Sequence, residues 1–180
     1  MRGKQLPSRM KVHRESGVSA QGTTKRFPDS PVLTPGASYT EEHARAGINA
    51  HLPEIETWLN QFPRYEIEIQ IPEFTSVCPK TGLPDFGKLT LHYMPDKKCL
   101  ELKSLKMYAL AYRNLGIFYE NVVNRFLRDV VEAAEPVWAT LSGEFTPRGG
   151  LQSRIVANWS REHGFGLKRA AGEHHSKTDP

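Results

Sequence analysis

Four short stretches in which apolar and polar side chains alternate set the strongest limit on the fold. They cover residues 65–71, 88–93, 137–141 and 151–157. Successive side chains of a strand point to opposite faces of its sheet, so a period of two is typical of strands with one buried face. The pattern predicts four strands, with a long loop over residues 72–87 and a turn at Arg148-Gly149-Gly150.

Between the second and third predicted strands, the apolar side chains follow helical spacing. One helix is predicted from about Lys103 to near Asn114, and a second from Tyr119 to a stop at Pro136, since proline cannot continue a helix. The second helix has an apolar face made of Val122, Val123, Phe126, Leu127, Val130, Val131 and Ala134.

The predicted order strand, strand, helix, helix, strand, strand defines an α+β domain, an antiparallel sheet that carries both helices on one face. Such a sheet has open edges, and unpaired edges favour aggregation. Joining the sheets of several subunits into a barrel removes these edges. We therefore expect a homo-oligomer.

Charge and composition separate a folded domain from two tails. Residues 1–30 carry seven basic and two acidic side chains, whereas residues 31–150 carry 12 and 15. We predict a disordered basic tail over 1–38, a folded domain over 39–165 and a flexible tail over 166–180. A folded nucleic-acid-binding face would concentrate Lys and Arg. Because acidic side chains outnumber basic ones over residues 31–150, we expect no direct contact with nucleic acid.

Within the domain, two further short elements are expected before the first strand. Thr40 precedes two glutamates in a pattern typical of a helix cap, which predicts a short helical turn. The apolar spacing over residues 52–62 predicts a short amphipathic turn or helix.

Membrane, secreted and metal-binding classes find no support in the sequence. No segment reaches the roughly 20 apolar residues of a membrane-spanning helix, and the basic N-terminus lacks the apolar region of a secretory signal. Cys78 and Cys99 cannot build a disulfide framework and have no Cys/His spacing for zinc. We expect a cytoplasmic protein with no membrane partner and no metal.

The two cysteines differ in their surroundings. Cys78 lies in a polar segment close to Lys80, and nearby positive charge lowers the pKa of a thiol toward a reactive thiolate. Asp85, in the same predicted loop, can return a proton to the group that the thiolate attacks. A loop cysteine without a role is an equal alternative. Cys99 begins an apolar strand, and we expect it only to pack.

Three further segments carry groups that can bind a ligand. Lys103 and Lys106 are three residues apart, so a helix places both ammonium groups on one side, toward a phosphate; a solvated charged face is the alternative. Arg148 precedes two glycines that permit close approach of a ligand, with a plain hairpin turn as the alternative. Glu120 complements the dipole of the second helix or, if buried, accepts paired N–H donors from a purine-like ring.

Taken together, these segments resemble the NADPH-dependent 7-cyano-7-deazaguanine reductases, the nitrile reductases of queuosine biosynthesis, in their short single-module form. The order and spacing of the motifs are intact from about residue 53 to 160, and the tails lie outside the resemblance. The motifs are FTSVCPKTG at 74–82, PDF at 84–86, ELKSLK at 101–106, YRN at 112–114 followed by Phe118 and Glu120, and FTPRGG at 145–150.

The resemblance implies the tunnelling fold (ββααββ), with subunits assembled into a barrel and active sites between neighbours. Cys78 matches the nucleophile that attacks the nitrile carbon and forms a thioimide. Asp85 matches the acid that protonates the nitrile nitrogen. Two NADPH molecules, used in turn, then reduce the thioimide and the imine that follows it, which yields 7-aminomethyl-7-deazaguanine without a metal.

The resemblance also implies which residues bind the two small molecules. Glu120 matches the carboxylate that reads the deazaguanine edge. The other residues implied to line the substrate pocket are Leu100, Glu101, Leu102 and Tyr119. The segment implied to bind NADPH contains Lys103, Ser104 and Lys106, and Arg148 is implied as a contact of cofactor or substrate.

Two positions depart from some relatives. Tyr119 stands where they carry His, and a phenol with a pKa near 10 is a poorer proton shuttle at neutral pH. Leu102 replaces a smaller polar residue. The rival interpretations are an amidine-forming relative that uses the same thioimide on tRNA, against which the Lys-Ser-x-Lys segment argues, and a non-catalytic purine-binding module. A zinc-dependent GTP cyclohydrolase shares the fold, but the sequence offers no Cys/His ligand set.

Overall fold

A five-stranded antiparallel sheet forms one layer of the molecule, with the strand order β2-β3-β5-β6-β7. The computed structural model describes residues 39–166, so the two predicted tails lie outside the described residues, Gly166 excepted. The strands of this sheet are β2 Ile67–Val77, β3 Pro84–Met94, β5 Trp138–Arg148, β6 Leu151–Ser160 and β7 Gly164–Phe165. A separate two-stranded sheet pairs β1 Thr57–Leu59 with β4 Lys98–Leu100.

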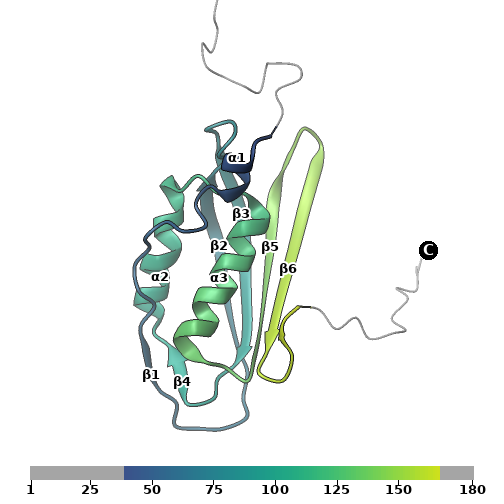
Figure 1. Cartoon of the computed structure of the whole chain (residues 1–180). Coiled ribbons are helices and arrows are strands. Elements are labelled where there is room, and N and C mark those ends of the chain that lie inside the picture. The colour runs from purple at the N-terminus through teal and green to yellow at the C-terminus, as the bar shows by residue number, and fades with distance from the viewer. Residues whose placement is uncertain (1–38, 167–180) are drawn as a thin grey trace, which may run out of the picture.

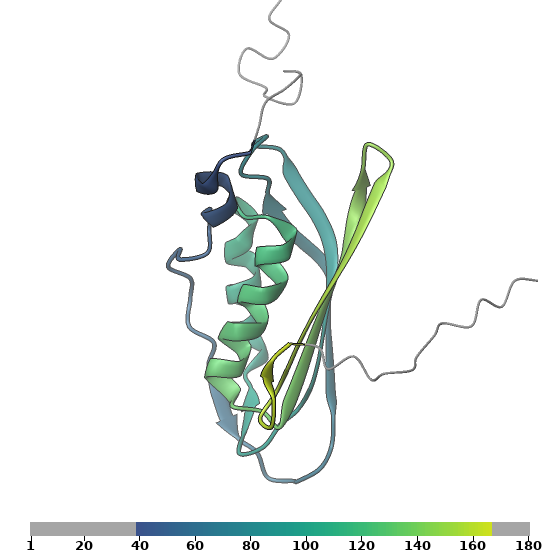
Figure 2. The ribbon, with the colours of Figure 1, turned by 45° about the vertical axis from the view of Figure 1, so that its right-hand side comes forward.

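Two long helices form the second layer, on one face of the large sheet (Figure 1). They are α2 Leu102–Ala111, continued by a 3-10 turn over Tyr112–Asn114, and α3 Tyr119–Ala134. The short helix α1 Glu41–Arg45 lies beside the first turn of α3 (Figure 1). In Figure 2 the layers are seen from the side, and the far end of the β5–β6 hairpin stands away from the helices. The predicted α+β arrangement, an antiparallel sheet with both helices on one face, is confirmed.

The core lies between α3 and the central strands. All seven residues predicted to form the apolar face of α3 are buried, and they pack with Leu89, Leu91 and Leu141 of β3 and β5. The predicted start of α3 is confirmed, and the helix ends at Ala134, two residues before Pro136. The predicted cap at Thr40 is also confirmed, because its hydroxyl accepts from the His43 backbone N–H and His43 bonds back to Thr40.

The long loop predicted over residues 72–87 is wrong, and the connection covers only residues 78–83. The register of β2 against β3 shifts between Ile71 and Phe74, as at a β-bulge, and this shift interrupts the alternation on which the prediction depended. Gly87, which suggested a loop, is inside β3. A Cβ there would lie 2.8 Å from the Glu144 carbonyl oxygen and from the Phe145 ring, so only glycine fits.

The amphipathic turn or helix predicted over residues 52–62 is also wrong. The segment is extended, and Thr57–Leu59 within it pairs with β4. Leu52 and Ile55 pack on the core from this extended chain, whereas Phe62 is exposed. Pro53 and Pro63, which lack a backbone N–H, disfavour a helix here.

Candidate active site

Cys78 is held at the end of β2 by backbone hydrogen bonds on both sides. Its N–H donates to the Leu83 carbonyl at 2.9 Å, and the Gly82 N–H donates to the Cys78 carbonyl at 2.9 Å. Gly82 has φ 67°, a conformation that favours glycine and closes the turn. The preceding residue, Val77, is hydrogen-bonded to Leu115 and Ile117 before α3. The sulfur position is therefore tied to both layers.

The environment of Cys78 favours its thiolate form. The side chain is only 6% exposed, and burial by itself raises the pKa of a thiol. Hydrogen bonds from the Thr81 hydroxyl, from the Thr81 and Lys80 backbone N–H groups and from Arg148 outweigh burial, so the pKa of Cys78 falls below its ordinary value. A low-pKa thiol is the nucleophile that attack on carbon requires.

Asp85 lies on β3 and is also buried, at 2% exposure. The Tyr119 hydroxyl, from the first residue of α3, donates to Asp85 Oδ1 at 2.7 Å. The Arg148 guanidinium, from the end of β5, contacts the same oxygen. Burial and the nearby charge of Cys78 raise the pKa of Tyr119, so its hydroxyl remains a donor at neutral pH.

Tyr119 is fixed as an aromatic ring as well as a donor. Its ring stacks on Phe145 of β5 at a centroid distance of 3.9 Å and an interplanar angle of 15°. The Arg148 guanidinium lies 5.7 Å from the centre of the Tyr119 ring. We call Cys78, Asp85, Tyr119 and Arg148 the nucleophile cluster. Its members come from the end of β2, from β3, from α3 and from β5, so only the folded chain brings them together.

Glu120 follows Tyr119 in the first turn of α3 and is exposed in the single chain. A carboxylate here complements the positive end of the helix dipole. Its exposed side chain lies near Tyr119 of the nucleophile cluster, where a ligand that carries N–H donors can reach it.

The remaining predicted residues lie around the first turn of α2. Leu100 is buried in the core. Glu101 caps α2, accepting from the backbone N–H groups of Lys103 at 2.9 Å and Ser104 at 2.6 Å, and these bonds lower the pKa of Glu101. The Ser104 hydroxyl donates to the Glu101 carbonyl and accepts from the Glu56 N–H. The side chains that stay exposed are Leu102, Lys103 and Lys106.

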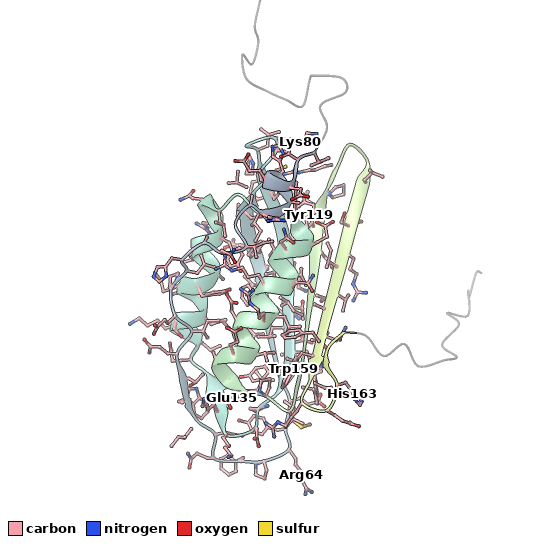
Figure 3. All side chains as sticks on the ribbon, in the orientation of Figure 1. Arg64, Lys80, Tyr119, Glu135, Trp159 and His163 are labelled. Carbon is pink, nitrogen blue, oxygen red and sulfur yellow. The ribbon has the colours of Figure 1, made fainter. Side chains whose placement is uncertain are left out.

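The start of α2 and the nucleophile cluster lie toward opposite ends of the folded domain. Tyr119 begins α3 and Glu135 follows its last residue, and a helix of 16 residues is about 24 Å long. Lys98, at the start of the strand that leads to α2, pairs with Glu135 at 2.7 Å. Figure 3 shows Lys80 and Tyr119 at one end and Glu135 at the other. One chain therefore does not bring residues 100–106 to Cys78.

Comparison with known proteins decides the family. Residues 84–163 match the family described as QueF-like protein. The NADPH-dependent 7-cyano-7-deazaguanine reductase of Elusimicrobium minutum is 61% identical over 125 residues, which cover 69% of this chain and 95% of that protein. The chain belongs to the 7-cyano-7-deazaguanine reductase family. The reductase of the same name from Chlorobaculum tepidum is 55% identical over 59% of this chain and 93% of its own length.

A solved structure is also similar to this chain. It is described as an archaeosine synthase QueF-Like in the apo form, and it has a TM-score of 0.49 and 22% sequence identity, with 52% of this chain and 91% of that chain covered. The resemblance to the 7-cyano-7-deazaguanine reductases, predicted from the motifs, is confirmed by the relatives above.

Two contributors to this reductase-family site were missed in the sequence. Ser76 is fully buried, faces Asp85 across the β2–β3 ladder, and its hydroxyl has no hydrogen-bond partner within residues 39–166. Phe145 supports the Tyr119 ring. No local pattern indicates Ser76, because a period of two carried past Ile71 would place it on the exposed face of Glu68 and Gln70, and the register shift after Ile71 turns it inward.

The described part of the chain contains neither a cluster of metal ligands nor a membrane-spanning helix. Residues 39–166 bring no three His, Cys, Asp or Glu side chains together as metal ligands. Over the same residues, no helix is both long and apolar enough to span a bilayer.

Proposed function

We propose that the protein reduces the nitrile of 7-cyano-7-deazaguanine to the aminomethyl group of 7-aminomethyl-7-deazaguanine, with two NADPH per nitrile. The protein is an NADPH-dependent oxidoreductase, as its relatives at 52–61% identity are named. The observation that carries the proposal is the Cys78 thiol, whose pKa is lowered and which shares Arg148 with the buried carboxyl of Asp85. The product would serve queuosine synthesis for tRNA in the cytoplasm, without direct contact with nucleic acid.

The first chemical step is capture of the nitrile by Cys78. The Cys78 Sγ–H bond breaks and its proton passes to Asp85; the sulfur then bonds to the nitrile carbon, and Asp85 gives the proton to the nitrile nitrogen. The carbon–nitrogen triple bond becomes a double bond, and the product is a thioimide. Nitriles are weak electrophiles, so covalent capture together with protonation replaces one difficult step by two easier ones.

NADPH, when bound, supplies the hydrides for the two reductions that follow. The described residues fit its negative charge, because Lys103 and Lys106 are exposed on the first turns of α2 and offer two ammonium groups on one face. The Ser104 hydroxyl is engaged with Glu101 and Glu56 inside the chain. In our proposal the lysines therefore bind the phosphates and Ser104 shapes the helix start.

Substrate recognition falls to Glu120 in this proposal. Its carboxylate is exposed next to Tyr119 of the nucleophile cluster and can accept two N–H groups of the deazaguanine ring. Tyr119, whose hydroxyl is bound to Asp85, contributes its ring to the pocket wall. Leu100, Glu101 and Leu102 would belong to the pocket of a neighbouring copy, because one chain holds them away from Cys78.

We further propose a homo-oligomer of the tunnelling-fold type, with each site shared between two copies. The support is the separation of residues 100–106 from Cys78 in one chain. The outer edge of β2 is also unpaired from Ile67 to Ser76 within residues 39–166, and a groove of about 290 Å³ runs between β2 and α2. Two large exposed apolar side chains, Leu102 and Leu110, line this groove together with residues of β2. Unpaired edges and apolar patches of this kind favour association of copies.

The test is anaerobic mixing of the pure protein with 7-cyano-7-deazaguanine, first without NADPH and then with it. Intact mass measures the adduct on Cys78, and nicotinamide absorbance measures oxidation. An adduct followed by oxidation of two NADPH per nitrile supports the reductase. An adduct without oxidation favours the amidine-forming rival, and neither result favours a binding module. Cys78→Ala, which lacks the thiol, is the negative control for both the mass and the absorbance measurement.

A second experiment tests the shared site. Cys78→Ala and the double variant Lys103→Ala/Lys106→Ala are each expected to be inactive at low NADPH concentration. Co-expressed with different tags and purified as mixed oligomers, they should regain activity, because some interfaces then combine an intact Cys78 with an intact lysine pair. Mixed oligomers that stay inactive would contradict a site shared between copies.

A further inference from the structure

Arg148 is bound to the nucleophile cluster by three contacts. Its guanidinium contacts Asp85 Oδ1, donates to the Pro84 carbonyl at 3.0 Å, and hydrogen-bonds to Cys78. The turn at Gly149 and Gly150, both with positive φ, directly follows Arg148 and reverses the chain into β6. A side chain held in this way belongs to the chemistry at Cys78 rather than to a distant cofactor group.

Arg148 is a cation that contacts both Cys78 and Asp85. Lys80 belongs to the same loop as Cys78 and lies over the Tyr39 ring, with its Nζ 3.8 Å from the ring centre. Tyr119 from α3 and Arg148 from β5 lie near the thiol, and both contact Asp85 of β3. An anion as buried as Cys78 or Asp85 requires a partner, because removing a charge from water is costly.

We propose that Arg148 is the counter-ion of a Cys78–Asp85 pair that holds one proton and one negative charge. When the proton is on sulfur, the charge is on the carboxylate; when it moves to Asp85, the charge is on the thiolate. The guanidinium contacts both groups, so it stabilises the anion on either atom without moving. This role rests on the proposed function only for the identity of the substrate.

The geometry at Asp85 agrees with such a pair. Tyr119 and Arg148 both contact Oδ1, so Oδ2 is the oxygen on which Asp85 can carry the proton. During capture the proton passes from Sγ to Oδ2 and then to the nitrile nitrogen, and the pair returns to a single negative charge on Asp85. Arg148 therefore has a charge to balance at every stage.

The test is the pH dependence of Cys78 alkylation by iodoacetamide in the resting protein, without nitrile or NADPH, followed by peptide mass. Arg148→Gln should raise the midpoint by about one pH unit, which slows alkylation about tenfold near neutral pH. Arg148→Lys, which keeps the charge, should restore most of the rate. Asp85→Asn should lower the midpoint, because the opposing carboxylate is gone. Arg154→Gln, from the neighbouring strand and paired with Glu144, is the matched control with no shift expected.

An unchanged alkylation profile in both Arg148 variants, with a raised KM for NADPH, would overturn the proposal and make Arg148 a cofactor contact. If Arg148→Gln does not fold, Asp85→Asn decides, and an unchanged midpoint in Asp85→Asn counts against the pair. Alkylation needs neither substrate nor cofactor. If the alkylation midpoint shifts as expected but the protein does not reduce the nitrile, the charge pair is supported and the proposed function is refuted. If the protein reduces the nitrile but the midpoint does not shift, the proposed function is supported and the pair is refuted.

Discussion

Two of the clusters of ionisable side chains within residues 39–166 differ in construction. The nucleophile cluster draws its members from four elements, and its arginine is 39% exposed. The second, which we call the helix cluster, consists of Tyr108, Tyr112, Arg125 and Asp129 and lies within α2, the turn after it, and α3. The arginine of the nucleophile cluster is partly exposed, whereas the arginine of the helix cluster is only 7% exposed.

The helix cluster shows that a shifted pKa is no sufficient sign of a functional site. Burial raises the pKa of Tyr108 above its ordinary value and that of Tyr112 to about 12. The Tyr108 hydroxyl bonds to Asp129 at 2.6 Å, and Arg125 binds the carbonyls of Gly47 and Ala50. These bonds join the helices to the N-terminal segment, so we interpret the cluster as structural.

The largest effect should come from Cys78→Ala. Without the sulfur no thioimide forms, and we expect turnover to fall by at least about 10⁴-fold while the fold persists. The other thiol is the matched control. Cys99 is buried beside the Tyr65 hydroxyl at 3.1 Å, so Cys99→Ala should keep the rate and lose about 1 kcal/mol of stability. Steady-state rates and urea unfolding of both variants measure this; equal rates would refute a nucleophilic Cys78.

Asp85→Asn should follow in size. A general acid contributes about 10²–10⁴-fold, and an amide cannot deliver a proton to the nitrile nitrogen. Adduct formation on Cys78, measured by intact mass against time, should slow by that factor. Asp96→Asn is the control, since Asp96 pairs with Arg161 at the surface at 2.8 Å and is not part of the nucleophile cluster. Adduct formation at the normal rate in Asp85→Asn would remove Asp85 from the capture step.

The parts of the fold that could be predicted from the sequence were those with local signals. The apolar face of α3 needs only the spacing of its own residues, and the ends of α3 are marked by Tyr119 and Pro136. The extension of β2 to Val77 could not be read, because the register shift after Ile71 breaks the alternation.

The candidate site also has a part with local sequence signals and a part that depends on contacts between distant segments. Cys78 and Asp85 were identified within a single motif region, which the structure places on neighbouring strands. The contact of Arg148 with Asp85 joins residues 63 positions apart. Such a contact depends on the pairing of β3 with β5 and on the turn after Arg148, and no pattern within either segment indicates it.

Asp129→Asn tests the interpretation of the helix cluster. It removes the charge that partners Arg125, a side chain only 7% exposed, and should cost about 3 kcal/mol of unfolding free energy. The rate per folded molecule should not change. Glu132→Gln lies one turn further along α3 in an exposed pair with Arg128, and it should cost less than about 0.5 kcal/mol. A large loss of kcat in a stably folded Asp129→Asn would show that the helix cluster also serves the reaction.

The smallest and most direct comparison removes one hydroxyl from each cluster. Tyr119→Phe keeps the ring on Phe145 but loses the 2.7 Å bond to Asp85, so capture should slow about threefold to tenfold, as expected for about 1 kcal/mol, with little change in stability. Tyr108→Phe loses the bond to Asp129 and should show the reverse, about 1 kcal/mol of stability and an unchanged rate. Adduct kinetics and urea unfolding on both variants separate the two. If both variants lose only stability, Tyr119 packs in the site without assisting Asp85, and the proton passes between Cys78, Asp85 and the nitrile nitrogen alone.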